Sequence, residues 1–356
     1  MDNLYTKLKI FHFQKKLDSL PAAIETILPP IHIRIKPTNI CNHHCWYCAY
    51  RAADLQLGKD MVVKDSIPQA KMLEIINDIS ELGVQAVSFS GGGEPFCYPF
   101  LASAVKGLIR HGIRFACLTN GSLLSGEAAE LFAHHGTWVR VSMDGWDDAS
   151  YTKYRRVQDG EFSRIIRNIK GFKAFGGRSF LGVSFILDKD NYSHLFDLAR
   201  QLKDAGVDSL KIAPCIISNT SAGNNAYHAS FFAEARHAID RTCRDLADGH
   251  FEIYNAYHKQ QASFSKSYTW CPYLQILPVI GADLNVYSCQ DKAYNLECGL
   301  IGSIKDVRFR DFWSLNKQKF FRIDPSRDCQ HHCVAHEKNL LVHEYLNADL
   351  DHLGFV

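Results

Sequence analysis

Three cysteines lie close together near the start of the chain, at Cys41, Cys45 and Cys48, with the spacing Cys-x3-Cys-x2-Cys. They directly follow a β-rich run, so we expect them on the loop after a strand. Three thiolates on one loop can bind three irons of a 4Fe-4S cube and leave the fourth iron open for a small molecule. Zinc is the alternative metal, with His43 or His44 as the fourth ligand that a structural zinc site requires.

A glycine run, GGGEP at Gly91–Pro95, follows a second predicted strand at 86–90. The carboxyl ends of neighbouring parallel strands meet at one edge, so this run is expected beside the cysteine loop. Glycines let the backbone approach a ligand closely, and Glu94 offers an acceptor for an ammonium group. Taken alone, the run would equally suit a glycine turn with a solvated glutamate.

Four more cysteines fall in the last quarter of the chain and suggest a second metal site. They are Cys271, Cys289, Cys329 and Cys333. The residues between the first two predict a hairpin that turns at 281–283, and the last two enclose two histidines in CQHHC. A structural zinc ion is the alternative here, bound through Cys329, Cys333, His331, His332 and His336.

The composition indicates that these cysteines are reduced. The chain has 356 residues, 12 cysteines and a net charge of +2, and its first twenty residues spread charge through apolar positions. It has no signal peptide pattern and no apolar run long enough for a membrane span, which predicts a cytoplasmic protein. Reduced cysteines favour metal ligation over disulfides. The near-neutral charge predicts no nucleic-acid or membrane partner.

The elements that must position these residues alternate between strand and helix. The predicted strands are 31–38, 86–90, 115–121, 138–145, 180–188 and 209–215, and the predicted helices are 69–83, 100–112, 126–136, 162–177 and 192–206. Six such repeats predict an α/β fold with a parallel sheet, and their length favours a partial barrel. A polar stretch at 217–230 predicts a loop or linker before a long helix at 231–249.

The cysteine triplet with Tyr47 before its last cysteine, followed by Gly-Gly-Glu after the second strand, resembles the radical S-adenosylmethionine (SAM) superfamily. The resemblance implies a partial (β/α)6 barrel over 31–216 and a 4Fe-4S cluster on the triplet, whose open iron chelates SAM. It implies cofactor contacts at Tyr47, Gly92, Gly93, Glu94, Ser142, Asp144, Arg155, Ile212 and Ala213. The alternatives are turn caps at Ser142 and Asp144 and a surface charge at Arg155.

The second set of cysteines resembles the SPASM/twitch extension of radical enzymes, over about 265–340. The resemblance implies an auxiliary 4Fe-4S cluster on Cys271, Cys289, Cys329 and Cys333, in a small α+β cysteine-rich domain over 265–356. Four cysteines suit the shorter twitch form with one cluster. The expected organisation is completed by an N-terminal extension over 1–30 and a linker with a helix over 217–264.

The resemblance implies that reductive cleavage of SAM gives a 5′-deoxyadenosyl radical that abstracts hydrogen from a substrate. An external donor such as flavodoxin or ferredoxin would supply the electron. We expect a small polar metabolite, such as a sugar or nucleotide-linked sugar, to be dehydrogenated. Epimerisation is the first alternative and needs a thiol hydrogen donor, for which Cys215 and Cys97 are candidates. The others are modification of a peptide and a non-catalytic metal-binding module.

Few signals in the sequence identify substrate contacts. The candidates that follow predicted strand ends or the hairpin are Tyr98, Arg156, Lys189, Lys211, Asp291 and Lys292. Only about 30 residues precede the first strand, too few for a leader-binding domain, which weakens the expectation of a peptide substrate.

Overall fold

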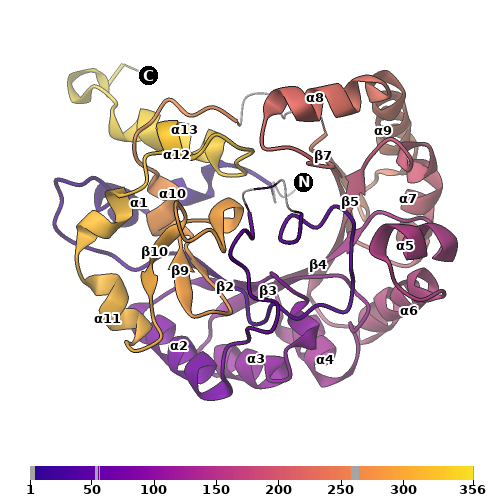
Figure 1. Ribbon diagram of the computed structural model, residues 1–356, viewed down its shortest axis with the longest axis horizontal. Helices are drawn as coiled ribbons and strands as arrows, with labels where there is room; N and C mark the ends of the chain where they lie inside the picture. The colour runs from indigo at the N-terminus through magenta and orange to yellow at the C-terminus, as the bar shows by residue number, and fades with distance from the viewer. Residues whose placement is uncertain (1–4, 53–54, 56, 258–263, 356) are drawn as a thin grey trace.

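The computed structural model describes residues 5–52, 55, 57–257 and 264–355. Within this part of the chain, one ten-stranded sheet has the order β10-β9-β8-β1-β2-β3-β4-β5-β6-β7. The strands are β1 His32–Ile35, β2 Ala86–Phe89, β3 Arg114–Thr119, β4 Trp138–Met143, β5 Phe180–Leu187, β6 Ser209–Pro214, β7 Glu252–Asn255, β8 Val279–Ile280, β9 Asn285–Tyr287 and β10 Leu300–Ser303. The sheet curves around the middle of the molecule (Figure 1).

Strands β1 to β7 run parallel, each paired with its neighbour in chain order. Helices connect them on the outer side of the sheet (Figure 1). These helices are α2 Gln69–Leu82, α3 Leu101–Arg110, α4 Gly126–His135, α6 Glu161–Ala174, α7 Leu195–Asp204 and α9 Phe232–Leu246. The predicted α/β fold and partial barrel are confirmed, because a parallel sheet with outer crossover helices is this architecture.

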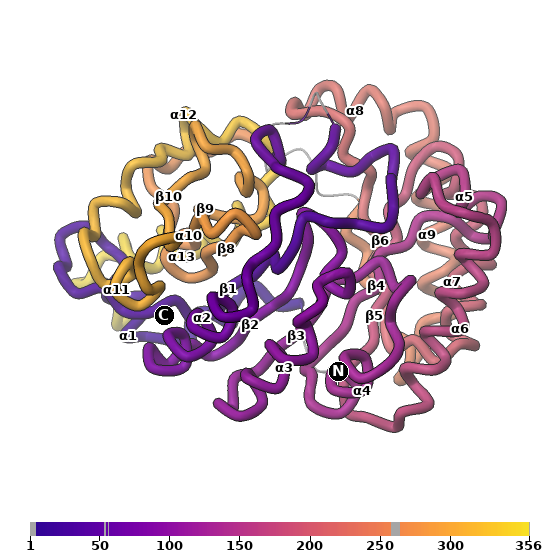
Figure 2. The backbone as a smooth tube through the Cα atoms, turned by 60° about the horizontal axis from the view of Figure 1, so that its bottom comes forward, coloured from indigo at the N-terminus to yellow at the C-terminus, as the bar shows by residue number. Residues whose placement is uncertain are grey.

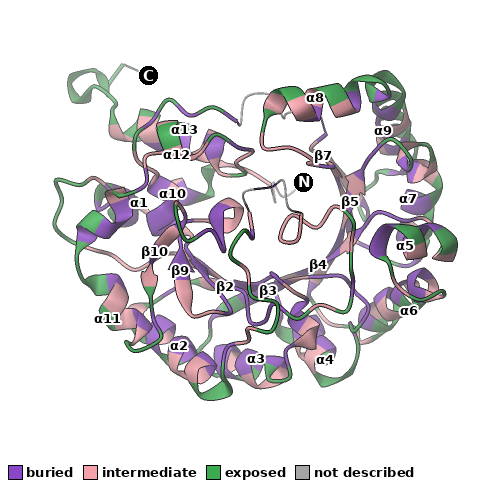
Figure 3. Ribbon diagram, in the orientation of Figure 1, coloured by how far each residue is buried: buried purple, intermediate pink, exposed green. Residues whose placement is uncertain are grey.

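The two faces of the curved sheet differ in chemistry. In β4, Val139, Val141 and Met143 are fully buried in the core formed with the outer helices. The alternate positions, which include Arg140 and Ser142, face inward and are half-buried, since side chains alternate across a strand. Purple strands inside a ring of helices with green outer surfaces show the same division (Figure 3). Inward-facing polar residues are therefore available to a site.

Two helices and one strand of the barrel part were not predicted. The stretch 217–230, expected as a loop or linker, contains helix α8 (Ser221–Ala229), whose start is capped by the Thr220 side chain. Helix α5 (Asp148–Arg155) follows β4 and begins with a capping box. Strand β7 adds a seventh parallel strand beside β6. Each element is short, and tertiary contacts stabilise it more than its own periodicity does.

The C-terminal part joins the other edge of the same sheet. Strand β8 pairs in parallel with β1, and the β8–β9 hairpin turns after Gly281, as predicted. Figure 2 shows this part, in orange and yellow, beside the β1 edge of the barrel. Its helices are α10 Pro272–Ile276, α11 Phe309–Ser314, α12 Pro325–Asp328 and α13 His336–Leu346.

The N-terminal segment packs on the C-terminal part. It contains a 3-10 helix over Leu8–His12 and helix α1 over Gln14–Asp18. Ile10, Leu17 and Leu20 share a small apolar core with Ile276 and Val342. No helix among the described residues is both long and apolar enough to cross a membrane.

Candidate active site and second cysteine group

The cysteine loop and the glycine run pack directly against each other. Gly93 N–H donates to the Thr38 carbonyl over 3.1 Å, and Glu94 N–H donates to the Ile40 carbonyl over 2.9 Å. A Cβ at Gly93 would lie 2.1 Å from the Ile40 oxygen, so only glycine allows this approach. The structure thus brings the two predicted motifs together, and part of the need for glycine comes from the neighbouring loop.

Glu94 links the glycine run to the end of β3. Its buried carboxylate accepts hydrogen bonds from Thr119 Oγ1 and Asn120 N, both at 2.6 Å, and from Phe96 N at 3.1 Å. Burial raises the pKa of Glu94, and these donors oppose that rise. Asn120 also donates to the Asn42 side chain over 2.9 Å, next to Cys41. Thr119 and Asn120 were missed, although the Asn-Gly turn after the third strand was a signal.

A buried ion pair lies beside the cysteine loop. Arg155 Nε and Asp144 Oδ1 are 2.8 Å apart, and Arg155 Nη1 donates to Cys45 Sγ over 3.5 Å. Both side chains are almost fully buried, so Arg155 is no surface charge. Asp144 Oδ2 and Arg155 Nη2 have no hydrogen-bond partner among the described residues. Unpaired buried polar atoms are costly, which indicates that this pair is shaped to meet a polar ligand.

The remaining predicted cofactor contacts lie around this ion pair or along β6. The Tyr47 ring centre is 5.7 Å from the Arg155 guanidinium, and Ser142 and Ala213 lie at half-buried positions. Ile212 differs, because its side chain is fully buried in the core with the outer helices. Any contact of Ile212 with a cofactor must therefore come from its backbone. The roles of these four residues stay predictions.

The thiols of the first group influence one another electrostatically. Burial, together with the charges of Glu94 and Cys45, raises the pKa of Cys41 to about 12. Of the two alternative fourth ligands, His43 forms a 3.1 Å hydrogen bond to Glu161. The other, His44, meets the Arg51 guanidinium at 3.0 Å. Both imidazoles are thus already engaged by other side chains.

The four cysteines of the second group come from distant parts of the sequence, yet they lie near enough to act on one another electrostatically. Burial raises the pKa of Cys289, as do Asp291 and the thiols of Cys333, Cys329 and Cys271. Burial lowers the pKa of Lys266, whose ammonium donates to the His331 carbonyl. Lys292 Nζ lies 2.9 Å from Cys298 Sγ and also donates to the Asp328 carbonyl. Two lysines thus supply positive charge beside four thiols, a feature that the sequence did not reveal.

Both groups have a donor set that suits iron–sulfur clusters. Across 5–52, 55, 57–257 and 264–355, no three His, Cys, Asp or Glu side chains gather closely enough to hold one metal ion. A cube places each thiolate on a different iron, so what it requires is several thiols around a common volume. The lysines near the second group would offset the negative charge of four thiolates. The unpaired N–H of Arg155 would suit a carboxylate such as that of SAM.

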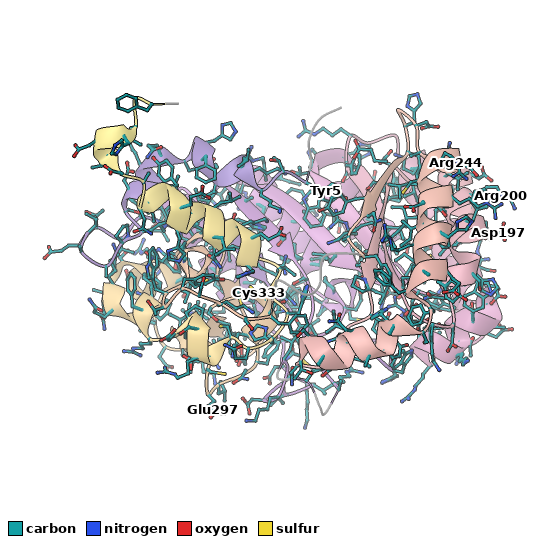
Figure 4. All side chains as sticks on the ribbon, turned by 90° about the horizontal axis from the view of Figure 1, so that it is seen from above. Tyr5, Asp197, Arg200, Arg244, Glu297 and Cys333 are labelled. Carbon is teal, nitrogen blue, oxygen red and sulfur yellow. The ribbon has the colours of Figure 1, made fainter. Side chains whose placement is uncertain are left out.

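Two cavities extend between the cysteine groups. The smaller, of about 130 Å³, includes Ala49, next to Cys48, in its wall. The larger, of about 300 Å³, is lined by Lys211, Ala213, Pro214, Ile216, Tyr254, Ala256, His332, Cys333, Val334 and Glu337. The two share Ile216 and His332, and Figure 4 shows Cys333 on the side of the C-terminal part that faces the middle of the molecule. A small molecule there would lie between both groups.

The thiol candidates do not line the larger cavity. Cys215 is 1% exposed at the end of β6, and burial raises its pKa strongly. Burial also raises the pKa of Cys97, whose thiol is held near Asn42. Of the six candidate substrate residues, Lys211 lines the larger cavity and Asp291 the smaller. The other four lie elsewhere: Tyr98 donates to the Ile67 carbonyl, Lys292 contacts Cys298, and Lys189 and Arg156 are exposed.

A parallel partial barrel with this cysteine triplet at its mouth defines a class of protein. The family model described as "Radical SAM superfamily" matches residues 35–202, so this part of the chain is a radical SAM domain. Its family implies a 4Fe-4S cluster and SAM as cofactors.

Curated relatives share only part of their length with the chain. An S-adenosylmethionine-dependent nucleotide dehydratase of Lacinutrix mariniflava is 28% identical over 34% of this chain and 25% of the relative. An Fe-coproporphyrin III synthase of Methanosarcina barkeri is 28% identical over 47% of this chain and 40% of the relative. The chain thus matches less than half the length of either relative.

Solved structures show the same fold. Streptococcus suis SuiB bound to the precursor peptide SuiA has a TM-score of 0.62 at 16% identity, covering 86% of this chain and 69% of that one. The protein anSMEcpe with bound AdoMet has a TM-score of 0.60 at 18% identity, covering 86% of this chain and 89% of that one. At these identities the likeness concerns the fold alone.

Proposed function

We propose that the protein reductively cleaves SAM and dehydrogenates a small polar metabolite, such as a sugar or nucleotide-linked sugar. The cavity of about 300 Å³ between Lys211 and Cys333 is the observation that carries this proposal. Pockets of this size suit a small molecule. A precursor peptide, which SuiB binds in its solved structure, is the alternative substrate class and would need a longer groove.

When bound, the first cluster and SAM would supply the 5′-deoxyadenosyl radical that removes a hydrogen atom from a substrate carbon. Cys41, Cys45 and Cys48 would hold this cluster, with Glu94 and the Asp144–Arg155 pair orienting the methionine part of SAM. A carbinol that loses one hydrogen atom, then one proton and one electron, becomes a ketone. The wall of the cavity contains Cys333, so a cluster on the second group could accept that electron from a neighbouring substrate.

The electron that starts the reaction would come from an external donor such as flavodoxin or ferredoxin. A surface cavity of about 610 Å³ extends from Asn42, next to Cys41, to Arg156, Arg164 and Arg167. These three arginines are exposed. Asp159 and Glu161 also line this cavity, and Glu161 pairs with Arg164, so three arginines against two carboxylates leave a net charge of +1. This modest positive charge beside the first cysteine loop would favour association with an acidic donor protein, more so at low salt.

The test is product analysis with anaerobically reconstituted, reduced protein in deuterated water. A panel of sugars and nucleotide-linked sugars is incubated with SAM, and products are identified by mass spectrometry. Dehydrogenation predicts a product with two hydrogens fewer, no solvent deuterium at the reacting carbon, and one 5′-deoxyadenosine per product. A product of unchanged hydrogen content that gains one deuterium would contradict it and support epimerisation.

A further inference from the structure

The inner face of the barrel gathers five cations. Four belong to the barrel: Arg34 on β1, Lys36 directly after β1, Arg140 on β4 and Lys211 on β6. The fifth is Lys338 on α13, whose charge acts on Lys211. Burial, together with the charges of Arg140, Lys338 and Arg34, lowers the pKa of Lys211 to about 8. A barrel interior is usually filled with apolar side chains, so this concentration of positive charge requires an explanation.

Where these cations have hydrogen-bond partners, the partners are neutral. Arg34 donates to the Gln290 amide oxygen over 2.8 Å, and Lys36 donates to the Gly91 carbonyl over 2.6 Å. Arg140 donates to the Tyr5 hydroxyl over 2.9 Å. Within the described part of the chain, none of the five takes part in an ion pair.

Three carboxylates lie near this set and do not neutralise its five charges. Glu252 on β7 is the register partner of Ser209 and faces the same side of the sheet. The charge of Asp291 reaches Arg34 and Lys36 and raises their pKa values against the dominant effect of burial. Glu337 stands in the cavity wall but is paired with Lys7. The inner face therefore keeps an excess of positive charge.

Polar atoms without partners lie among these cations. Arg34 Nε, Arg140 Nε and Ser209 Oγ are buried and have no hydrogen-bond partner among the described residues. A Cβ on Gly182 would lie 3.0 Å from Ser209 Oγ and 3.5 Å from Arg140 Nε, so both atoms border a position without a side chain. Lys211 lies two residues beyond Ser209, on the same face of β6, and has no described acceptor. Such donors are costly to bury unless a ligand meets them.

One end of this region is closed by the N-terminal segment. The Tyr5 ring stacks on Tyr254 at a centroid distance of 4.3 Å, and its hydroxyl accepts from Arg140. Figure 4 places Tyr5 beside the barrel strands. Tyr254 and Lys211 pair across β6 and β7 and both line the larger cavity, which has Cys333 in its opposite wall. Of the five cations, Lys211 lies in the cavity wall itself, and Arg140 is connected to this end of the cavity through Tyr5 and Tyr254.

We propose that this end of the cavity is an anion subsite, in which Lys211 binds a phosphate or carboxylate group of the substrate and Arg140 and Ser209 supply further donors. An anion would satisfy the unpaired donors and relieve the repulsion between like charges. The substrate role of this anion rests on the proposed function, whereas the binding of an anion can be measured independently of any reaction.

The test compares charged and uncharged probes on the reconstituted holoenzyme with SAM bound. Ribose 5-phosphate is titrated against ribose, and gluconate against glucose, by anaerobic calorimetry. At least one anion is expected to bind about tenfold more tightly than its uncharged partner, and Lys211→Met should remove that advantage. Lys211→Arg should keep most of it. Lys170→Met, which neutralises an exposed lysine on the outer helix α6, should match the wild type.

The anion whose affinity exceeds that of its uncharged partner by the larger factor shows whether the subsite prefers phosphate or carboxylate. Equal affinity for charged and uncharged probes in the wild type, or no binding of either anion, would overturn the subsite whatever the variants do. Retention of the full preference in a folded Lys211→Met protein would also overturn it. The proposed function fails separately, if the wild type forms no 5′-deoxyadenosine, and that result leaves the binding measurement valid.

Discussion

The two cysteine groups are built in opposite ways. The first takes three thiols from eight consecutive residues, Cys41 to Cys48, on one loop after β1. The second takes four thiols from residues spread over 271–333 and adds Lys266 and Lys292 beside them. The first group is therefore local and can exist as soon as its loop forms. The second exists only when the hairpin, the CQHHC loop and the segment around Lys266 have folded together.

The difference teaches what each group can do. The first borders Arg155 Nη2 and Asp144 Oδ2, polar atoms without protein partners, and so has capacity left for a ligand. The second group is buried and has lysines beside it, and its four thiolates would leave no iron of a cube open. The first group is suited to chemistry on a bound molecule, and the second to holding structure or accepting an electron.

The largest effect is expected from the first group. Replacing Cys41, Cys45 and Cys48 together by alanine should abolish 5′-deoxyadenosine formation, because no thiolate remains on that loop to hold a cluster. The chain should stay folded, since the loop contributes little to the core. Chromatography of the reaction with SAM and dithionite measures this. Cys243→Ala, in helix α9 and outside both groups, is the matched control; substantial 5′-deoxyadenosine from the triple variant would disprove the assignment.

Removal of one ligand from the second group should act on stability as well as turnover. Cys289→Ala should lower substrate turnover by about tenfold or more. It should also lower the midpoint of thermal unfolding, because metal binding at this group is coupled to folding. Calorimetric melts of variant and wild type, both reconstituted, give the comparison. An unchanged melting midpoint together with unchanged turnover would show that the second group is neither structural nor catalytic.

A smaller effect is expected at the buried pair beside the first group. Arg155→Ala leaves Asp144 buried and unpaired, which should cost about 3–5 kcal/mol of stability. Arg155→Lys keeps the charge but loses the planar fork, so it should weaken SAM binding by about tenfold with a smaller loss of stability. Equilibrium binding of SAM to the reconstituted proteins separates the two effects. Wild-type affinity in Arg155→Lys would mean that the guanidinium does not contact SAM.

The smallest effect concerns the charge beside the second group. Lys266→Met removes a buried cation, so adding an electron to a cluster there should become harder, by about 60 mV for a tenfold change in the equilibrium constant. A potentiometric titration followed by electron paramagnetic resonance measures the shift. The signal of the first cluster is the internal control and should not move. If the reduction potential of the first cluster shifted instead, the assignment of Lys266 to the second group would be wrong.

Local patterns in the sequence predicted much of this molecule. The six strands, their crossover helices and the hairpin after Cys271 followed from periodicity and turn residues, and both cysteine groups from spacing. The side chains that complete the sites could not be predicted in the same way. Asn120, Lys266 and the inward-facing cation set reach their positions through the curvature of the sheet, which brings distant residues together without any sequence signal.

The missed elements have a similar cause. Helix α8 is polar and rich in small residues, so its composition resembled a loop, yet a Thr220 cap and the buried Asn224 and His228 hold it in place. Strand β7 has four residues, too few to show alternation, and its pairing with β6 defines it. In both cases tertiary contacts outweigh local propensity.

The central claim is that one chain holds two separate cubes. The iron and sulfide content after anaerobic reconstitution tests this claim most directly. Metal analysis with electron paramagnetic resonance should give about eight irons and eight sulfides per chain, with two distinguishable signals. The variant without Cys41, Cys45 and Cys48 and the variant without the four later cysteines should each keep about four irons. Stoichiometric zinc in place of iron, or loss of all iron when only one group is removed, would contradict the account.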